Sequence, residues 1–222
     1  TAGIVIGRSS ADANGPNLTF YKTRAEESGL ESSVGGADID DNDIIGNINF
    51  KGRTNAGATT GAKISAELDG TVGTNSAPAA LTFHTMEDGT TSLVERIRIA
   101  GDGKIGINTN DPTAPFHINT GSGTGNITDG LLIENTHDGS TTAPDVALYK
   151  NSVTPAANDS LGAIWFYGNN SDGDSHVFSG IYAKATDVTA ASEDSELVFQ
   201  TIQAGTSRST VEITSNTCLL YP

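Results

Sequence analysis

Apolar and polar residues alternate along most of the short segments of this chain, which is typical of half-buried β-strands. Leu18 and Phe20 show this pattern, and Ile48 and Phe50 repeat it. Clusters of Gly, Asn, Asp, Ser and Thr separate the alternating segments, and these residue types favour turns. The pattern predicts an all-β fold with about seven short antiparallel strands in each half of the chain, arranged as a β-sandwich or jelly roll.

The same order of segments occurs twice. Gly46 to Gly52 (GNINFKG) returns as Gly162 to Gly168 (GAIWFYG), with both glycines, the isoleucine and the phenylalanine in register. The repeat predicts one module that is duplicated after about 115 to 128 residues. Further pairs keep the order: Gly3 to Ile6 with Gly130 to Ile133, Pro16 to Lys22 with Pro144 to Lys150, Lys63 to Glu67 with Gly180 to Lys184, Leu81 to Thr85 with Leu197 to Thr201, and Arg96 to Ile99 with Thr210 to Ile213.

The repeat predicts the domain organisation. We expect a first module at residues 1–118, a linker rich in Gly, Thr and Ser at residues 119–129, and a second module at residues 130–222. The first copy has about twelve more residues than the second ahead of its GNINFKG segment. Insertions of this kind are tolerated in exposed loops, so we expect a surface loop at residues 23–45. The second copy does not reach the equivalent of residues 106–118 and is expected to be truncated in this chain.

Composition predicts a thin core that neighbouring subunits complete. Hydrophobic residues make up 36% and aromatic residues 6% of the chain, below the usual share for a globular protein. Thin cores suit elongated assemblies whose copies bury surface against one another. The net charge of -15 excludes nucleic acid as a partner, because phosphates require clustered cations. Apolar runs are too short to span a bilayer, so no membrane insertion is expected. The single cysteine excludes an internal disulfide.

Val94 to Ile107 (VERIRIAGDGKIGI) predicts a hairpin. A Gly-Asp-Gly turn separates two alternating runs, which is the signal for a tight turn with positive φ. We expect Ile97 and Ile99 to face the core. Arg96 and Arg98 then share the opposite face, where their guanidinium groups reach acidic neighbours. The two arginines are predicted to hold surfaces together, with an anion-binding site as the alternative.

Residues 81–118 carry an ordered series of motifs. Leu81 to Thr85 (LTFHT) is followed by an Asp-Gly turn, by Glu95 to Ile99 (ERIRI), by Ile105 to Ile107 (IGI) and by Phe116 to Ile118 (FHI). This series resembles a module of tail fibres and related virion appendages of tailed bacteriophages. The chain departs from the family pattern at Ile97, where the family often has Met, and at Asn108, where it usually has Gly.

The resemblance implies an extended, homotrimeric and non-enzymatic appendage of a virion, and therefore a virion or extracellular location. In agreement with this, the sequence has no Gly-x-Ser-x-Gly motif and no evident partner for a nucleophile. We therefore expect no catalytic residues, no cofactor and no enzymatic activity.

Two loops are rich in carboxylate and amide oxygens, which are the ligands that calcium prefers. Neither loop has the terminal glutamate and flanking helices of a helix-flanked calcium loop, and the two fall at different places in the repeat. Solvated turns are therefore expected, with no metal site. The calcium candidates are Asp38, Asp40, Asp41 and Asp43 in one loop and Asp172 and Asp174 in the other.

Three aromatic residues are predicted to lie on the outward face of the second module. Trp165 and Tyr167 alternate with inward-facing residues, and Tyr182 lies on the matching face of a nearby strand. Exposed aromatic rings either contact a neighbouring subunit or stack on sugar rings. Both interpretations stay open from the sequence.

The leading hypothesis is a structural subunit of a phage tail fibre or similar virion appendage, which associates with itself as a homotrimer and contributes to host attachment. A self-assembling extracellular filament of cellular origin, in which a strand of one subunit completes the next, is the alternative. A glycan-binding β-sandwich module, with a cell-surface glycan as partner, is the third hypothesis.

Overall fold

The computed structural model describes residues 18–22, 39–73, 76–121, 130–140, 143–215 and 217–220. All regular secondary structure in these ranges is β-strand, and they contain no helix. The chain divides into two compact units, residues 1–132 and 133–222. These observations confirm the predicted all-β class with two tandem antiparallel modules.

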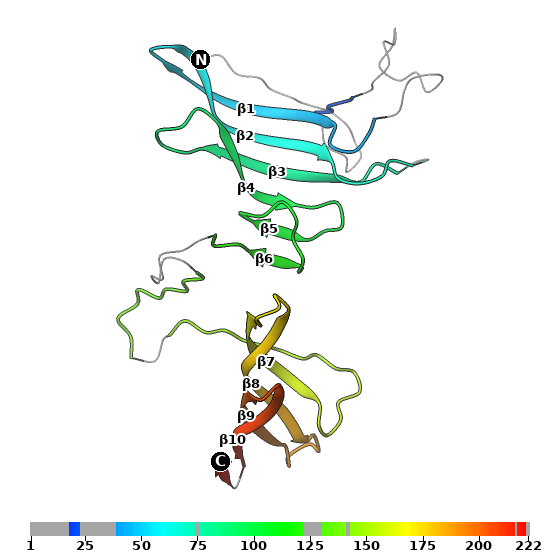
Figure 1. Ribbon diagram of the computed structural model, residues 1–222, viewed down its shortest axis with the longest axis vertical. Coiled ribbons are helices and arrows are strands. Elements are labelled where there is room, and N and C mark those ends of the chain that lie inside the picture. Colours follow the sequence, from blue (N-terminus) through cyan, green and yellow to red (C-terminus); the bar gives the residue numbers. More distant parts are fainter. Residues whose placement is uncertain are drawn as a thin grey trace, which may run out of the picture. The chain divides into compact units, whose positions relative to one another are not determined.

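The first unit contains one six-stranded sheet, whose strands lie side by side in chain order (Figure 1). All neighbouring strands are antiparallel except the last two, which are parallel. The strands are β1 (Ile44–Thr54), β2 (Gly57–Leu68), β3 (Ala79–Met86), β4 (Leu93–Ile99), β5 (Ile105–Ile107) and β6 (Phe116–Ile118).

The second unit contains one five-stranded antiparallel sheet, again with neighbours in chain order. Its strands are coloured from yellow to red in Figure 1. They are β7 (Ser160–Asn169), β8 (Ser175–Asp187), β9 (Asp194–Gln203), β10 (Thr206–Thr214) and β11 (Cys218–Leu220).

The strand register shows the sequence repeat in three dimensions. Residues that pair directly across strands lie on the same face of a sheet, so a chain of pairs traces a row. Each sheet has a row of apolar residues across all its strands, and we call the face that carries it the row face and the opposite one the reverse face. The rows are Ile48, Ile64, Phe83, Ile97, Ile107 and Ile118 in the first sheet, and Ile164, Ile181, Phe199, Val211 and Leu220 in the second.

The β-bulges repeat as well. The β1–β2 pair shifts register between Phe50 and Lys51, and the β7–β8 pair shifts at the matching place, between Phe166 and Tyr167. A bulge bends its strand and increases the local twist. The two sheets therefore share the position of this bulge as well as the order of their first strands.

An extended segment packs against a glycine at the start of each sheet. A Cβ atom at Gly46 would lie 2.7 Å from Cβ of Phe20, and a Cβ atom at Gly162 would lie 2.7 Å from Cβ of Leu148. Only glycine leaves room for such an approach. Phe20 and Leu148 also occupy equivalent places in the sequence repeat, so both units use the same packing.

The row face is exposed in a single copy of the chain. Ile48 is 44% exposed and Ile164 is 54% exposed. A sandwich needs a second layer against this face, and the described residues of each unit supply one sheet. The described residues that are both apolar and buried are Leu68, Ala80, Ala185 and Val198.

The predicted burial on β4 is therefore wrong for a single copy. Ile97 and Ile99 are each 39% exposed, whereas Arg98, which was expected to point outward, is 8% exposed. The described residues place no second sheet over the aliphatic side chains of β4, whereas the arginine lies under its own ion-pair partners.

The predicted hairpin is confirmed. The Gly103 N–H donates a hydrogen bond to the Ala100 carbonyl oxygen at 2.9 Å, and Gly103 has φ of 87°. The predicted loop at residues 23–45 ends earlier than expected, because β1 begins at Ile44. Residues 23–38 and 122–129, which include most of this loop and of the expected linker, lie outside the described residues.

Candidate functional site

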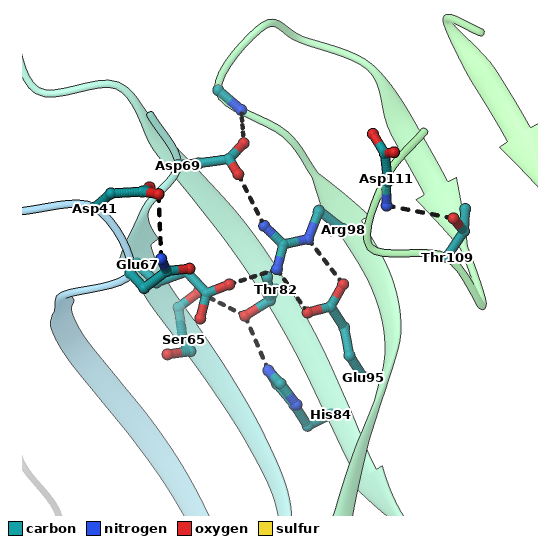
Figure 2. A network of polar contacts seen from close by, with 12 residues as sticks. Asp41, Ser65, Glu67, Asp69, Thr82, His84, Glu95, Arg98, Thr109 and Asp111 are labelled. Atoms are coloured by element: carbon teal, nitrogen blue, oxygen red, sulfur yellow. Dashed lines mark hydrogen bonds and ion pairs between the residues drawn. The ribbon is translucent and has the colours of Figure 1, made fainter. Parts of the chain in front are cut away.

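Arg98 is the centre of a polar cluster on the reverse face of the first sheet (Figure 2). Its Nε and Nη2 atoms donate hydrogen bonds to the two carboxylate oxygens of Glu95, each at 2.9 Å. Nη2 also donates to Glu67, and Nη1 donates to Asp69 Oδ1 at 3.2 Å. Such bidentate pairs are the strongest hydrogen bonds that arginine makes. One guanidinium group therefore joins three carboxylates.

The cluster joins strands β2 and β4 and also holds the loops that follow them. Glu67 comes from β2, Asp69 follows that strand, and Glu95 lies on β4. Asp69 Oδ2 accepts a hydrogen bond from the Gly101 N–H at 2.6 Å, which ties the β4–β5 hairpin to the end of β2. Asp41 Oδ1 similarly accepts from the Gly70 N–H at 2.8 Å.

The electrostatics of this cluster favour a structural role. The hydrogen bonds from Arg98 to Glu95, the largest cause, and to Glu67 raise the pKa of Arg98, against the opposing effect of burial. The guanidinium group is thus a permanent cation whose donors are already directed at carboxylates. An anionic ligand would have to compete with three internal carboxylates. The cluster therefore does not support the alternative of an anion-binding site.

Arg96 makes different contacts from Arg98. The β3–β4 pairing shifts register at this point, so that Ile97 opposes Phe83 while Glu95 opposes His84. Arg96 is the extra residue of this bulge. Its Nε donates to Thr85 Oγ1 at 3.0 Å, and its Nη2 lies 3.7 Å from a carboxylate oxygen of Glu87. Both arginines reach acidic neighbours, as predicted, but they do not form one site.

Small polar residues complete the reverse face of the first sheet. Ser65 and Thr82 are fully buried. The Thr82 hydroxyl donates to the Ser65 carbonyl oxygen at 3.3 Å and lies 2.9 Å from Nε2 of His84. Burial, followed by the positive charge of Lys63, lowers the pKa of His84. Every buried side-chain nitrogen or oxygen in the described ranges has a hydrogen-bond partner.

The second sheet carries charges of opposite sign at the positions equivalent to Arg98 and Glu67. The position of Arg98 is occupied by Glu212, and that of Glu67 by Lys184. Lys184 Nζ lies 2.8 Å from Glu196 Oε1. This hydrogen bond is the main cause that raises the pKa of Lys184, and the charge of Glu212 adds to it.

Two aromatic residues also lie on this reverse face. Trp165 and Tyr182 contact each other, with ring centroids 5.6 Å apart and planes inclined by 31°. The structure thus brings together two of the three predicted aromatic residues. Tyr167 lies beyond the bulge in β7, is 66% exposed, and does not take part in the ring pair.

A cleft of about 730 Å³ lies beside this aromatic pair. The extended segment before β7 forms one wall of the cleft, and strands β7, β8 and β9 form the other. Its volume falls within the range of roughly 300–1,000 Å³ that is usual for small-molecule sites. The polar and aromatic lining residues are Tyr149, Lys150, Ser160, Trp165, Tyr182 and Gln200.

The calcium candidates form ordinary turns. The Asp40 N–H donates to Asp43 Oδ2 at 3.0 Å, so this carboxylate closes a turn. The Asp172 and Asp174 N–H groups both donate to Asn170 Oδ1, at 3.0 and 2.8 Å. Within the ranges that the structure describes, no group of three or more His, Cys, Asp or Glu residues could hold a metal ion. Asp38 lies outside these ranges.

The same ranges contain no helix that is long and apolar enough to cross a membrane.

The sequence did not identify the acidic partners of Arg98 or the walls of the cleft. Glu67 and Asp69 precede Arg98 by about 30 residues, and strand register alone brings them together. Gly180, opposite Trp165 on the neighbouring strand, was a detectable signal. The first copy has Lys63 at this place, and the loss of a side chain beside a new tryptophan indicates room for a ring.

No family model matches this sequence, and no curated protein matches it. Solved structures of similar fold include two of a phage tail fibre. The carboxy-terminal domain of the bacteriophage T5 L-shaped tail fibre matches with a TM-score of 0.71 and 10% identity, covering 99% of this chain and 91% of that one. The same domain with its intra-molecular chaperone domain matches with a TM-score of 0.69 and 10% identity, covering 100% of this chain and 62% of that one. This chain has a tail-fibre-like fold.

Proposed function

We propose that this chain is a structural subunit of a phage tail fibre, that it assembles as a homotrimer through the row faces of its two sheets, and that it contributes to host attachment. The exposed row face carries the proposal. Covering apolar side chains on an exposed sheet face stabilises the assembly by about 25 cal/mol per Å² of apolar surface that is removed from water. The tail-fibre-like fold supports the same proposal.

The row face is exposed in both units, at equivalent positions. Phe50 is 54% exposed and its counterpart Phe166 is 51% exposed, while Ile97 and Val211 extend the row on later strands. Large contiguous apolar patches on soluble proteins mark interaction surfaces. A repeated patch on repeated modules favours a partner with the same repeat, which is another copy of this chain.

The extended segment at residues 143–150 supports self-association independently. Its sequence alternates like a strand, but no strand forms there. Val146 is 72% exposed, Leu148 is 54% exposed and Tyr149 is 83% exposed. We expect neighbouring copies to cover this segment at Val146, which does not line the cleft described above.

Two neighbouring residues of β1 provide a matched test. Ile48 belongs to the row face, and Asn49, which pairs with Lys63, lies on the reverse face. Both are exposed in the single chain, so a carboxylate at either position leaves the fold of one copy intact. Ile48→Asp is expected to reduce the oligomer to monomer, and Asn49→Asp to leave it unchanged. Light scattering during size-exclusion chromatography measures the mass, and far-UV circular dichroism checks the fold.

Four outcomes are informative. A wild-type mass of three chains with loss of assembly in Ile48→Asp supports the proposal. A monomeric wild type, or equal assembly of the two variants, contradicts it. A helical array with an exchanged strand in electron micrographs would favour the cellular filament instead. If Ile48→Asp does not fold, Ile164→Asp repeats the test in the second unit.

A further inference from the structure

The reverse faces of the two sheets differ in chemistry although they share one register. In the first sheet, the matching positions hold Asn49 and Ser65, and the polar cluster around Arg98 closes the face. In the second sheet, the same positions hold Trp165 and Tyr182. Trp165 remains 41% exposed. Large aromatic rings on an otherwise polar, solvent-facing surface are costly to keep in water and are typical of binding sites.

The aromatic pair is held in a defined orientation. Gly180 lies opposite Trp165, and a Cβ atom there would clash with ring atoms of the indole. The six-membered ring of the indole therefore covers the glycine and contacts the ring of Tyr182. Lys184 Nζ lies 5.3 Å from the centroid of this tyrosine ring, within cation–π range. The two rings form a preorganised apolar floor rather than two mobile side chains.

The cleft lining also has hydrogen-bonding residues. Gln200, Ser160, Tyr149 and Lys150 line the cleft, and each has a polar group in its side chain. A lining that combines aromatic rings with polar side chains matches a sugar ring, which has an apolar face of C–H groups and hydroxyls around its edge.

The charges around the cleft favour a neutral sugar. Lys150 Nζ is paired with Asp159 at 2.9 Å, and Lys184 with Glu196 at 2.8 Å. Both cations are thus compensated by carboxylates, and the chain as a whole has a net charge of -15. An acidic polysaccharide would be repelled at long range.

We propose that this cleft binds a neutral hexopyranose unit of a polysaccharide, with the C–H face of the sugar on Trp165 and Tyr182 and its hydroxyls directed at Gln200 and Ser160. The proposal rests on the proposed function in one respect: if copies associate through the row faces, the reverse face stays open to ligand. The proposal favours sugar stacking over subunit contact for Trp165 and Tyr182, because this aromatic pair and the apolar row lie on opposite faces of the sheet.

The chain offers a direct probe of this site. Trp165 is its only tryptophan, so a sugar that stacks on the indole changes the intrinsic fluorescence of the protein. The assembled full-length protein is first applied to an array of neutral gluco-, galacto- and manno-oligosaccharides and acidic uronic-acid oligomers. The best neutral binder is then titrated by fluorescence and by calorimetry.

The expected result is saturable binding of a neutral oligosaccharide with a dissociation constant on the order of 1 mM or below, near the weak end of specific binding. Trp165→Ala is expected to weaken binding about tenfold or more in calorimetry, which is the scale of losing one aromatic contact. Tyr182→Ala and Gln200→Ala weaken it as well. Tyr167→Ala is the matched control, because Tyr167 is an exposed aromatic residue of the same strand outside the cleft.

Mass measurements on the same variants separate this proposal from the proposed function. Loss of sugar binding in Trp165→Ala with an unchanged oligomer supports the site. Loss of the oligomer in Trp165→Ala shows that the ring pair is a subunit contact and overturns it. Absence of neutral-sugar binding, or binding of acidic oligomers only, also overturns it. A monomeric wild type that binds sugar through Trp165 would contradict the proposed assembly and leave the site standing.

Discussion

Removal of the Arg98 guanidinium group is the sharpest test of how the first sheet is held together. Arg98→Met keeps most of the aliphatic stem and leaves Glu67, Asp69 and Glu95 facing one another without a cation. Breaking a buried ion pair costs about 3–5 kcal/mol. The three carboxylates are 19–31% exposed, so part of this cost is relieved by solvent. We expect a loss of about 2–4 kcal/mol in the free energy of unfolding of the first unit.

Arg96→Met is the matched control, since it removes the same group two residues away on the same strand. The Arg96 side chain is 35% exposed and that of Glu87 is 64% exposed, at a separation of 3.7 Å. Exposed pairs of this kind contribute about 0–1 kcal/mol. The two variants have equal net charge, so any difference between them reports the contacts and not the charge of the chain.

Urea denaturation at one fixed protein concentration measures both variants. With a slope of about 2 kcal/mol per M, Arg98→Met lowers the midpoint by about 1–2 M and Arg96→Met by less than about 0.5 M. Circular dichroism follows both units, whereas the fluorescence of Trp165 follows the second unit alone. Equal midpoint shifts in the two variants would refute the reasoning.

Two further predictions concern single positions. Because burial lowers the pKa of His84 below 6.5, its contribution to stability is full above about pH 6.5 and is lost as the pH falls through the folded-state value. His84→Gln introduces the residue that the second copy has at the equivalent position, Gln200. This variant is expected to show a smaller drop in urea midpoint between pH 7.5 and 5.5 than the wild type. A drop of unchanged size would show that carboxylates, and not His84, cause it. Gly46→Ala places a Cβ against Phe20 and is expected to cost about 1–2 kcal/mol in thermal unfolding. Gly52→Ala, with open space around it, is expected to be neutral, and similar losses in both would contradict a packing effect.

Much of the fold was predictable because its signals are local. Period-two alternation marks strands, and a Gly-Asp-Gly turn between two alternating runs marks a hairpin, whatever the rest of the chain does. The repeat added the equivalence of β1 with β7 and of later strands, which the register shows. The acidic neighbours of Arg96 and Arg98 followed from charge surplus alone.

The sequence could not predict which face of each sheet is covered. Alternation assigns the apolar and polar side chains of a strand to opposite faces. The sequence pattern is the same whether the apolar face packs within one chain or between copies. Alternation therefore predicts that Ile97 and Ile99 face a core, whereas both are exposed in a single copy. The bulge that separates Arg96 from Arg98 was equally invisible, because it depends on the strand opposite.

The cleft of the second unit was out of reach for a related reason. Its floor follows from strand register, but Tyr149 and Lys150 enter it from a segment that forms no strand. The approach of this segment depends on Leu148 packing at Gly162. Neither contact has a local sequence pattern, and only the equivalence with Phe20 and Gly46 in the first copy pointed to it.

The polar reverse face has a physical role in a sheet of one layer. If both faces were apolar, copies could associate through either one, and several assemblies would have similar free energy. The Arg98 cluster closes the reverse face of the first sheet with charges that are satisfied internally, so covering it with another copy would gain little and would require desolvation of the rim. In the proposed assembly, this restricts association to the row face. The second sheet departs from this arrangement, because its reverse face carries the rings of Trp165 and Tyr182. Another copy could bind to these rings, so they make the reverse face less selective against association. Exposed aromatic rings on a polar face are expected where a ligand, and not another subunit, binds.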